Sequence, residues 1–395
     1  MDLTESYTPL SEINDRMARL KTAMAEAGMD AVLMMQSSDL FYFCGTTQQG
    51  YLYVPVDGEP LLMVRKDVDR ARVESPLTDI REINRLTEIP ENIGACPRVL
   101  GLEMDVISAE MFLNLQKLFD EAQCVNAAGP IRLLRAIKSD YEVDKIRQAA
   151  ALADQLDDLV PGILKPGMSE LEFSGRVEAE ARRLGHQGLI RMRLWGAELF
   201  YGHVMAGASA GVASSLSSPT GGPGTSPAFP QGGTFKPIRP EEPVLVDIAF
   251  AFQGYLADHT RIYAIGGISD ELRQAHQAML DVQNRVKEAA VPGTPAGHLY
   301  DLALARATEL GYAENFMGVG QKRIRFVGHG VGIDMDEFPF LARGQTLELA
   351  ENMIIALEPK LIFPGKGVVG IENTHVVTKN GLESLTTYPE EIIIT

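Results

Sequence analysis

Two acidic residues lie inside each of two strongly apolar segments of this chain, and this pattern limits what the chain can fold into. The first segment, Val244–Arg261, reads VLVDIAFAFQGYLADHTR and carries Asp247 and Asp258. Its two apolar runs meet at Gln253 and Gly254, which are typical of a hairpin turn. A hairpin places the two carboxylates on neighbouring strands, opposite or diagonal to each other depending on the length of the turn. A carboxylate in such an apolar strand requires a partner, because burying an isolated charge is costly.

A second segment repeats this arrangement nearer the C-terminus. Met353–Val377 reads MIIALEPKLIFPGKGVVGIENTHVV, which we expect to form two strands around Pro364–Gly367. Glu358 and Glu372 lie at equal sequence separations from Gly365 in that turn. Four carboxylates brought together repel one another at neutral pH unless protons or cations neutralise them. Two divalent ions would balance their charge, and hard or borderline metals prefer oxygen-rich sites.

A histidine between two glycines could add a nitrogen ligand. It is His329 in FVGHGVGIDMDEFPF, whose acidic residues are Asp334, Asp336 and Glu337. Taken alone, such a histidine is more often a turn residue, and such acids a solvated face. Together with the two carboxylate pairs, His329 indicates a dinuclear metal site, for which Mn, Co, Zn and Fe are all suitable ions. The predicted metal ligands are Asp247, Asp258, His329, Glu358 and Glu372.

Composition argues against several other classes of protein. The chain has 395 residues, which suggests two or three domains, and its net charge is −17, from 36 basic and 53 acidic residues. Such a charge disfavours nucleic acid and anionic membranes as partners. We find neither a signal pattern nor an apolar run of the roughly 20 residues that span a bilayer, so we expect a cytoplasmic protein. Three scattered cysteines form neither a disulfide framework nor a zinc knuckle.

Hydrophobic periodicity divides the chain in two. An amphipathic helix at Ile13–Gly28 is followed by alternating short apolar strands and helices, which predicts an α/β N-terminal domain over residues 1–137. Ser139 and Glu142 have the spacing of a capping box and should open a new helix. We therefore place the second domain at residues 138–395.

The second domain shows helix pairs beside strands, which hints at a structural pseudo-repeat. Two of its helices are expected at Asp270–Ala289 and Pro295–Leu310, the second with Thr294 as N-cap. Between the first helices and the acidic hairpin lies Ala206–Gln231, a stretch rich in Gly, Ser and Pro. Loops of this length are functional or mobile. Its Gly-Gly-Pro-Gly lacks the lysine of a phosphate-binding loop.

These motifs resemble the metallopeptidase family of methionine aminopeptidase, aminopeptidase P and prolidase. The matching stretches are, in order, VDIAFAFQGYLADHTR, VGHGVGIDMDE, ALEPKL and GIENTHVV. In addition, SSDLFYFCG and LRAIKSDYEVDKIRQAA resemble the creatinase-type N-terminal domain and its linker, which prolidase and aminopeptidase P possess. The resemblance covers nearly the whole chain. It implies an α/β N-terminal domain and an α+β pita-bread C-terminal domain with a pseudo-twofold repeat.

The resemblance also implies roles for the five ligands. Asp258 and Glu372 would bridge two divalent metal ions. Asp247 would complete one site, and His329 and Glu358 the other. A hydroxide bridging the metals would attack the scissile carbonyl, with Glu358 as general base. The implied protein is a homodimeric Xaa-Pro aminopeptidase or dipeptidase that acts on peptides.

Members of this family usually carry two further histidines near the metals, which bond the substrate carbonyl. Asp336 stands at one of these positions, seven residues after the ligand histidine, and Val204–Val246 contains no histidine for the other. His203 is our candidate for a replacement donor, and a structural histidine is the alternative. Asp336 either carries a proton at a raised pKa or pairs with an arginine such as Arg323 or Arg325.

Two other hypotheses stand beside a peptidase. A metal-dependent hydrolase or lyase of the same fold could act on a small non-peptide substrate, which the absent histidines and the loop at Ala206–Gln231 favour. A binding module without catalysis has no need of four mutually repelling carboxylates, and the chain retains all four. In the enzyme hypotheses the candidate catalytic residues are Glu358, His203 and Asp336.

Overall fold

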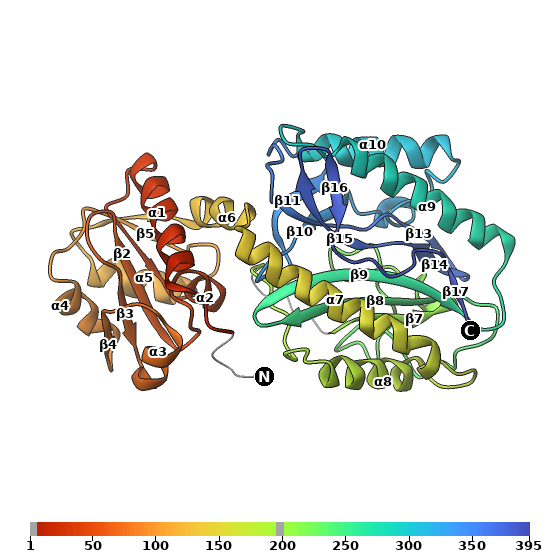
Figure 1. The fold of residues 1–395 in the computed structure, drawn as a ribbon, viewed down its shortest axis with the longest axis horizontal. Coiled ribbons are helices and arrows are strands. Elements are labelled where there is room, and N and C mark those ends of the chain that lie inside the picture. The colour runs from red at the N-terminus through yellow and green to blue at the C-terminus, as the bar shows by residue number, and fades with distance from the viewer. Residues whose placement is uncertain (1–5, 195–200) are drawn as a thin grey trace. The chain divides into compact units, whose positions relative to one another are not determined.

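The computed structural model describes residues 6–194 and 201–395 (Figure 1). Contacts along the chain group it into two compact units. The described part of the first unit comprises residues 6–135 together with Arg193 and Leu194. The second comprises residues 136–192 and 201–395. Each unit has its own β-sheet structure and its own apolar core.

The first unit is built on a mixed six-stranded sheet with the strand order β4-β3-β2-β1-β5-β6. Its strands are β1 (Ala31–Met34), β2 (Gly50–Pro55), β3 (Leu61–Val64), β4 (Ile80–Glu82), β5 (Val99–Leu102) and β6 (Gln123–Asn126). Its helices are α1 (Leu10–Glu26), α2 (Ser37–Cys44), α3 (Val68–Glu74), α4 (Ile89–Ile93) and α5 (Ala109–Leu118), and α6 (Ala128–Ala136) ends at the boundary between the units. The predicted amphipathic helix is confirmed as α1, which buries Ile13, Met17, Leu20 and Met24 at helical spacing.

The described residues of the second unit form three sheets and two pairs of α-helices. The helices are α7 (Asp140–Ile163), α8 (Glu170–Arg183), α9 (Asp270–Ala289) and α10 (Ala296–Glu309). The strands are β7 (Gly202–Ala206), β8 (Val244–Phe252), β9 (Tyr255–Ala264), β10 (Phe326–Gly330), β11 (Glu337–Ala342), β12 (Ile354–Leu357), β13 (Lys360–Phe363), β14 (Gly367–Gly370), β15 (Asn373–Thr378), β16 (Gly381–Ser384) and β17 (Ile393–Ile394).

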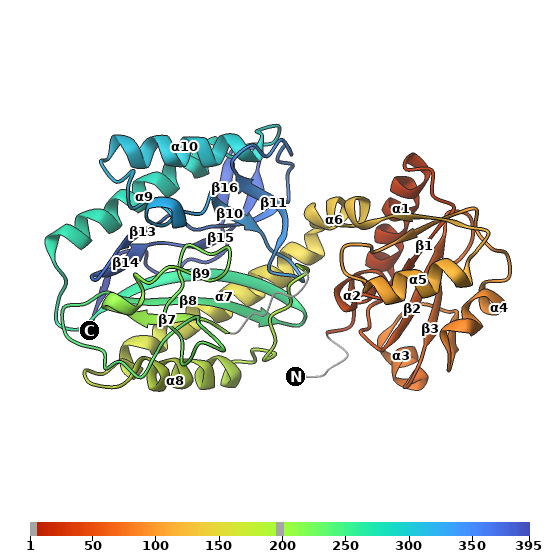
Figure 2. The ribbon, with the colours of Figure 1, turned by 180° about the vertical axis from the view of Figure 1, so that it is seen from behind.

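The sheets of the second unit lie between its two helix pairs. One sheet has the order β17-β9-β8-β7, the second β11-β10-β12-β15-β16, and β13 pairs with β14 alone. Both ribbon views show these strands between α8 and α10, with α7 lying along β8 and β9 (Figure 1, Figure 2). The long apolar strands are therefore covered by helices, which explains why β9 is buried along its whole length.

Two helix starts test the capping predictions. The capping box of α7 is confirmed, because Ser139 Oγ accepts from the Glu142 amide and the Glu142 carboxylate accepts from the Ser139 amide. The predicted start of α10 is wrong by one residue: its N-cap is Pro295, and Thr294 lies outside the helix. The Thr294 hydroxyl instead donates to the carbonyl of Ala289, at the end of α9, at 3.1 Å.

Within the described ranges, no helix is both long and apolar enough to cross a membrane.

Candidate metal centre

Asp247 and Asp258 lie on the antiparallel pair β8 and β9. The strands are joined by Gln253 and Gly254, which both have positive φ angles, 49° and 88°, as a tight hairpin requires. Asp247 pairs with Thr260, two positions along the strand from Asp258. The two carboxylates are therefore diagonal neighbours on the same face of the sheet, one of the two arrangements expected.

Glu358 and Glu372 lie where the second predicted hairpin changes sheets. The prediction of two continuous strands is wrong here, since the hairpin divides into β12 and β13 on one side and β14 and β15 on the other. Leu357 pairs with Asn373 before the break and Lys360 pairs with Gly370 after it, so the register is the same on both sides. That shared register sets Glu358 opposite Glu372 at the break.

Two threonines and an arginine join the two hairpins. Thr260 forms an isolated bridge with Glu372, and its hydroxyl donates to Glu372 Oε2 at 2.9 Å. The Asp258 amide donates to the hydroxyl of Thr374 at 2.8 Å. Arg261 is fully buried and donates to the carbonyls of Thr260 and Glu372. These bonds hold β9 against β15, so the two acidic pairs face one another.

His329 reaches the acids from the middle of β10. Its Nε2 atom lies 3.9 Å from Asp258 Oδ2 and 3.8 Å from Glu358 Oε1. The flanking glycines allow β10 to fit between β11 and β12. A Cβ on Gly328 would lie 2.5 Å from a backbone carbonyl oxygen of β12, and one on Gly330 would lie 2.2 Å from the carbonyl oxygen of Phe338.

Part of this cluster fits a divalent cation. Asp258, His329 and Glu372 each offer one ligand atom, and these three atoms lie within 4.8 Å of one another. Oxygen and imidazole donors at such spacing suit borderline divalent metals. Glu358 Oε1 faces the same imidazole and could add a further ligand.

Lys360 is a member of the cluster that the sequence-based prediction missed. Its Nζ atom lies 3.1 Å from Asp247 Oδ2, 2.9 Å from Glu358 Oε2 and 2.6 Å from Glu372 Oε2. The side chain is only 1% exposed. The available signal was its position two residues after Glu358, because alternate residues of an extended chain share a face.

The acids are in electrostatic conflict. Burial raises the pKa of Asp258 well above its usual range, and Glu372 and Asp247 raise it further. Burial also raises the pKa of Glu358 to about 8, although Lys360 opposes this shift. The positive charge of Lys360 therefore does not compensate fully for the four carboxylates, and a bound cation would stabilise their ionised forms.

His203 lies next to the centre on β7, directly across from Asp247. Its Nδ1 atom is 2.6 Å from the hydroxyl of Thr220, and its Nε2 atom is 2.8 Å from the side-chain amide nitrogen of Gln231. Burial lowers its pKa to about 4, so the ring is neutral at pH 7. Both ring nitrogens thus contact the loop rich in Gly, Ser and Pro. The role of His203 as a proton donor stays a prediction.

The acidic residues after His329 have different environments. Glu337 is buried, lies 3.0 Å from Lys138 Nζ and accepts bonds from the amides of Ile333 and Asp334. It therefore stabilises the turn before β11 and is not part of a solvated face. Asp336 is half-buried in the same turn. Its proposed pairing and its protonation stay predictions.

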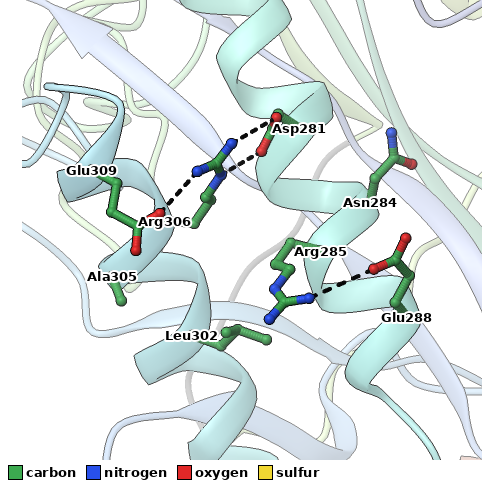
Figure 3. Close-up of a pocket in the computed structure, with 8 residues that line it drawn as sticks. All are labelled: Asp281, Asn284, Arg285, Glu288, Leu302, Ala305, Arg306 and Glu309. Atoms are coloured by element: carbon green, nitrogen blue, oxygen red, sulfur yellow. Dashed lines mark hydrogen bonds and ion pairs between the residues drawn. The ribbon is translucent and has the colours of Figure 1, made fainter.

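A separate surface groove runs between α9 and α10, and none of its lining residues belongs to the predicted ligand set (Figure 3). Arg306 pairs there with Asp281 and Glu309, and Arg285 with Glu288. The lining residues are Asp281, Asn284, Arg285, Glu288, Leu302, Ala305, Arg306 and Glu309. Since its arginines are paired with neighbouring carboxylates, the groove offers no chemistry comparable to that of the buried cluster.

An α+β domain whose strands bring four carboxylates and an imidazole together is typical of metal-dependent hydrolases. Comparison with known families is more specific. Residues 144–379 match the model of metallopeptidase family M24, and residues 16–137 match that of the creatinase/prolidase N-terminal domain. The chain belongs to metallopeptidase family M24, and the predicted family and fold class are confirmed.

Its relatives are similar over almost the full length. The chain is 27% identical to the Xaa-Pro dipeptidase of Pyrococcus furiosus over 387 residues, which cover 96% of this chain and 100% of the relative. The solved Xaa-Pro dipeptidase from Bacillus anthracis has a TM-score of 0.82 and 25% identity, covering 97% and 100% of the two chains. The solved prolidase from Pyrococcus furiosus has a TM-score of 0.77 and 26% identity, covering 93% and 99%.

Proposed function

We propose that this chain is a metal-dependent peptidase that cleaves Xaa-Pro peptides, most readily dipeptides. The observation that supports this most directly is the convergence of Asp258, His329 and Glu372 within 4.8 Å in a member of family M24. The full-length similarity to Xaa-Pro dipeptidases supports the substrate class. Mn, Co, Zn and Fe are all compatible with these donors.

The proposed chemistry assigns one task to each side chain. A divalent ion in this centre would polarise the scissile carbonyl and lower the pKa of a water molecule. Asp258, His329 and Glu372 would hold it. Glu358 would accept the proton of the attacking water at Oε1, the oxygen that faces His329, while its Oε2 atom is held by Lys360.

The number of ions is a finer question. The five predicted ligands would suffice for two ions, as the family resemblance implies, and a dinuclear centre remains a prediction. It depends on Lys360, whose ammonium lies among three of the four carboxylates.

The test is a screen of Xaa-Pro dipeptides and longer peptides with protein loaded with Mn²⁺ or Co²⁺. We expect turnover of Xaa-Pro dipeptides by the wild type and its loss in Asp258→Asn, which removes a ligand charge with little change in shape. Purified, metal-loaded protein that retains no divalent ion by elemental analysis would refute the proposal.

A second candidate keeps the metal and changes the activity to that of a hydrolase or lyase acting on a small non-peptide substrate. It is favoured by the loop at Ala206–Gln231, which bonds to His203 beside Asp247. A loop at this position could close the space that a longer peptide would need. Tight metal binding without turnover of any Xaa-Pro peptide would support this candidate over the first.

We also propose a domain boundary between residues 137 and 138 and a homodimer. Limited proteolysis would test the first, since cleavage should leave a stable fragment that begins near the start of α7. Light scattering on the purified protein would test the second, and a monomeric mass would contradict it.

A further inference from the structure

The ammonium of Lys360 has a carboxylate acceptor in the acidic cluster for each of its three donors. A lysine ammonium has three donors, and Lys360 faces three acceptors, one each from Asp247, Glu358 and Glu372, at 2.6–3.1 Å. An ion pair buried to this degree is held in place, because removing either partner leaves an uncompensated charge. Lys360 is therefore part of the centre and not a mobile neighbour.

The backbone around Lys360 is shaped for this position. Lys360 pairs directly with Gly370 across the β13–β14 hairpin. A Cβ at Gly370 would lie 2.7 Å from the Cα of Lys360, 3.1 Å from its Cγ and 2.4 Å from the Pro359 carbonyl. The Met317 amide also donates to the Lys360 carbonyl at 3.0 Å. The missing side chain at Gly370 leaves the space in which the lysine stem lies.

The cluster has two halves, which share Glu358 and Glu372. Glu358 Oε2 contacts Lys360, whereas Glu358 Oε1 faces His329. Glu372 Oε2 also contacts Lys360, and Glu372 offers a ligand atom beside Asp258 and His329. The lysine half also includes Asp247, and the histidine half includes Asp258. The two halves therefore offer two cation positions, and an ammonium occupies one of them.

Electrostatics decides against a second metal beside this ammonium. Four carboxylates carry four negative charges, which one divalent ion and one ammonium reduce to a single negative charge. A second divalent ion bound to Asp247 would compete with Lys360 for the carboxylate oxygens of Asp247. The ion would also repel the ammonium of Lys360 at close range. Expelling the buried ammonium would cost its three charged hydrogen bonds.

We propose that Lys360 replaces one of the two metal ions, so that each chain binds one divalent ion, in the half formed by Asp258, His329 and Glu372. This inference rests on the proposed metal-dependent function and specifies its centre. Lys360 then serves as a permanent positive charge at the Asp247 end. The single ion is held at the imidazole end.

The experiment measures bound metal by elemental analysis after loading with Mn²⁺ and dialysis. We expect about one ion per chain for the wild type and about two for Lys360→Met, whose apolar side chain leaves the Asp247 end to a second cation. Lys366→Met is the matched control on the same hairpin, because Lys366 is exposed and its ammonium pairs with the surface residue Glu271, outside the acidic cluster. It should retain about one ion.

Electron paramagnetic resonance of the Mn²⁺-loaded protein gives an independent reading. The wild type should show the hyperfine-resolved signal of an isolated ion, and Lys360→Met the broadened signal of an exchange-coupled pair. Two ions per chain in the wild type would overturn the inference and leave the proposed function intact. No bound ion in the wild type would refute the proposed function and the inference with it. If Lys360→Met does not fold, the wild-type stoichiometry and spectrum still decide.

Discussion

At the scale of single residues, the two oxygens of one carboxylate in the cluster can contact different partners. Glu358 shows this most clearly, with Oε2 bonded to Lys360 at 2.9 Å and Oε1 facing His329 at 3.8 Å. One oxygen is thus fixed by a charged hydrogen bond, and the other remains directed at the imidazole of His329. A side chain held in this way suits proton transfer, which requires a defined geometry.

Glu358→Gln tests this role. The amide keeps the size of the side chain but cannot accept the proton of the attacking water, so kcat should fall roughly 10²- to 10⁴-fold. The measurement is steady-state turnover of an Xaa-Pro dipeptide by metal-loaded protein. Glu383→Gln, on the exposed surface of β16, is the control and should leave kcat unchanged. Full turnover by Glu358→Gln would remove Glu358 from the mechanism.

The sequence predicted which carboxylates would meet, and it did not predict the lysine among them. Asp247 and Asp258 could be paired because hairpin geometry follows from two apolar runs and a short turn. Lys360 was overlooked because a lysine in a short motif is normally expected at the surface. Its burial depends on Gly370 and on acids from distant segments, which only the tertiary structure brings together.

At the scale of elements, the loop after β7 is bound to the site through one histidine. His203 contacts both Thr220 and Gln231, and the Gln231 side chain in turn bonds to Ser214 and Ser215. A segment with little regular structure is thus held by side-chain hydrogen bonds. Such a segment should open locally when a central partner is removed.

Replacing His203 by Ala should therefore increase amide hydrogen exchange in residues 214–231, because the loop loses two of its contacts. Gln231→Ala should have a similar effect, and Thr225→Ala, at an exposed position of the same loop, should have little. Hydrogen exchange followed by mass spectrometry provides the measurement. If exchange is unchanged in His203→Ala while turnover falls, the histidine acts as a donor and not as a support for the loop.

The elements also show which predictions local sequence supports. The β8–β9 hairpin and the capping box of α7 were predicted correctly because their signals are local. The C-terminal hairpin was predicted as two strands and forms four, since β12 and β15 join one sheet while β13 and β14 pair separately. That division is caused by packing against β10 and β16, partners that periodicity in one segment cannot reveal.

At the scale of the whole molecule, the first unit contains a buried charge cluster of its own. Asp39 is fully buried and lies 2.6 Å from Arg135 and 2.6 Å from Arg193, a residue far away in sequence. Arg193 also pairs with Asp105. Burial alone would raise the pKa of Asp39, but the two arginines outweigh it and lower the pKa to about 2.

Arg193→Met should destabilise the first unit by roughly 3–5 kcal/mol, because it leaves a buried carboxylate with one of its two cationic partners missing. Chemical denaturation followed by circular dichroism would measure the loss. Arg98→Met is a suitable control, since Arg98 is exposed and its contact with its acidic partner, Asp30, is a long one of 3.8 Å. Equal stability of the two variants would contradict the importance of the cluster.

Because of the same cluster, we expect the stability of the first unit to fall in acid. The folded pKa of Asp39, about 2, lies below its unfolded value of 3.8, so its ionised form stabilises the folded state at higher pH. This contribution, on the order of 2 kcal/mol, should be lost as the pH falls from about 4 to about 2. Denaturation curves at several pH values would measure it, and Asp39→Asn should flatten the dependence. An unchanged slope in that variant would assign the acid sensitivity to other carboxylates.

The pairing of Lys360 with Gly370 has an evolutionary consequence. A side chain at position 370 would collide with the lysine stem, so the two positions cannot change independently. Relatives that carry a larger residue opposite the hairpin lysine should have lost that lysine, and the substitutions should show strong epistasis. Gly370→Ala would then displace the lysine stem without changing the lysine itself, so a change at position 370 alone would alter the charge balance among the carboxylates that contact Lys360.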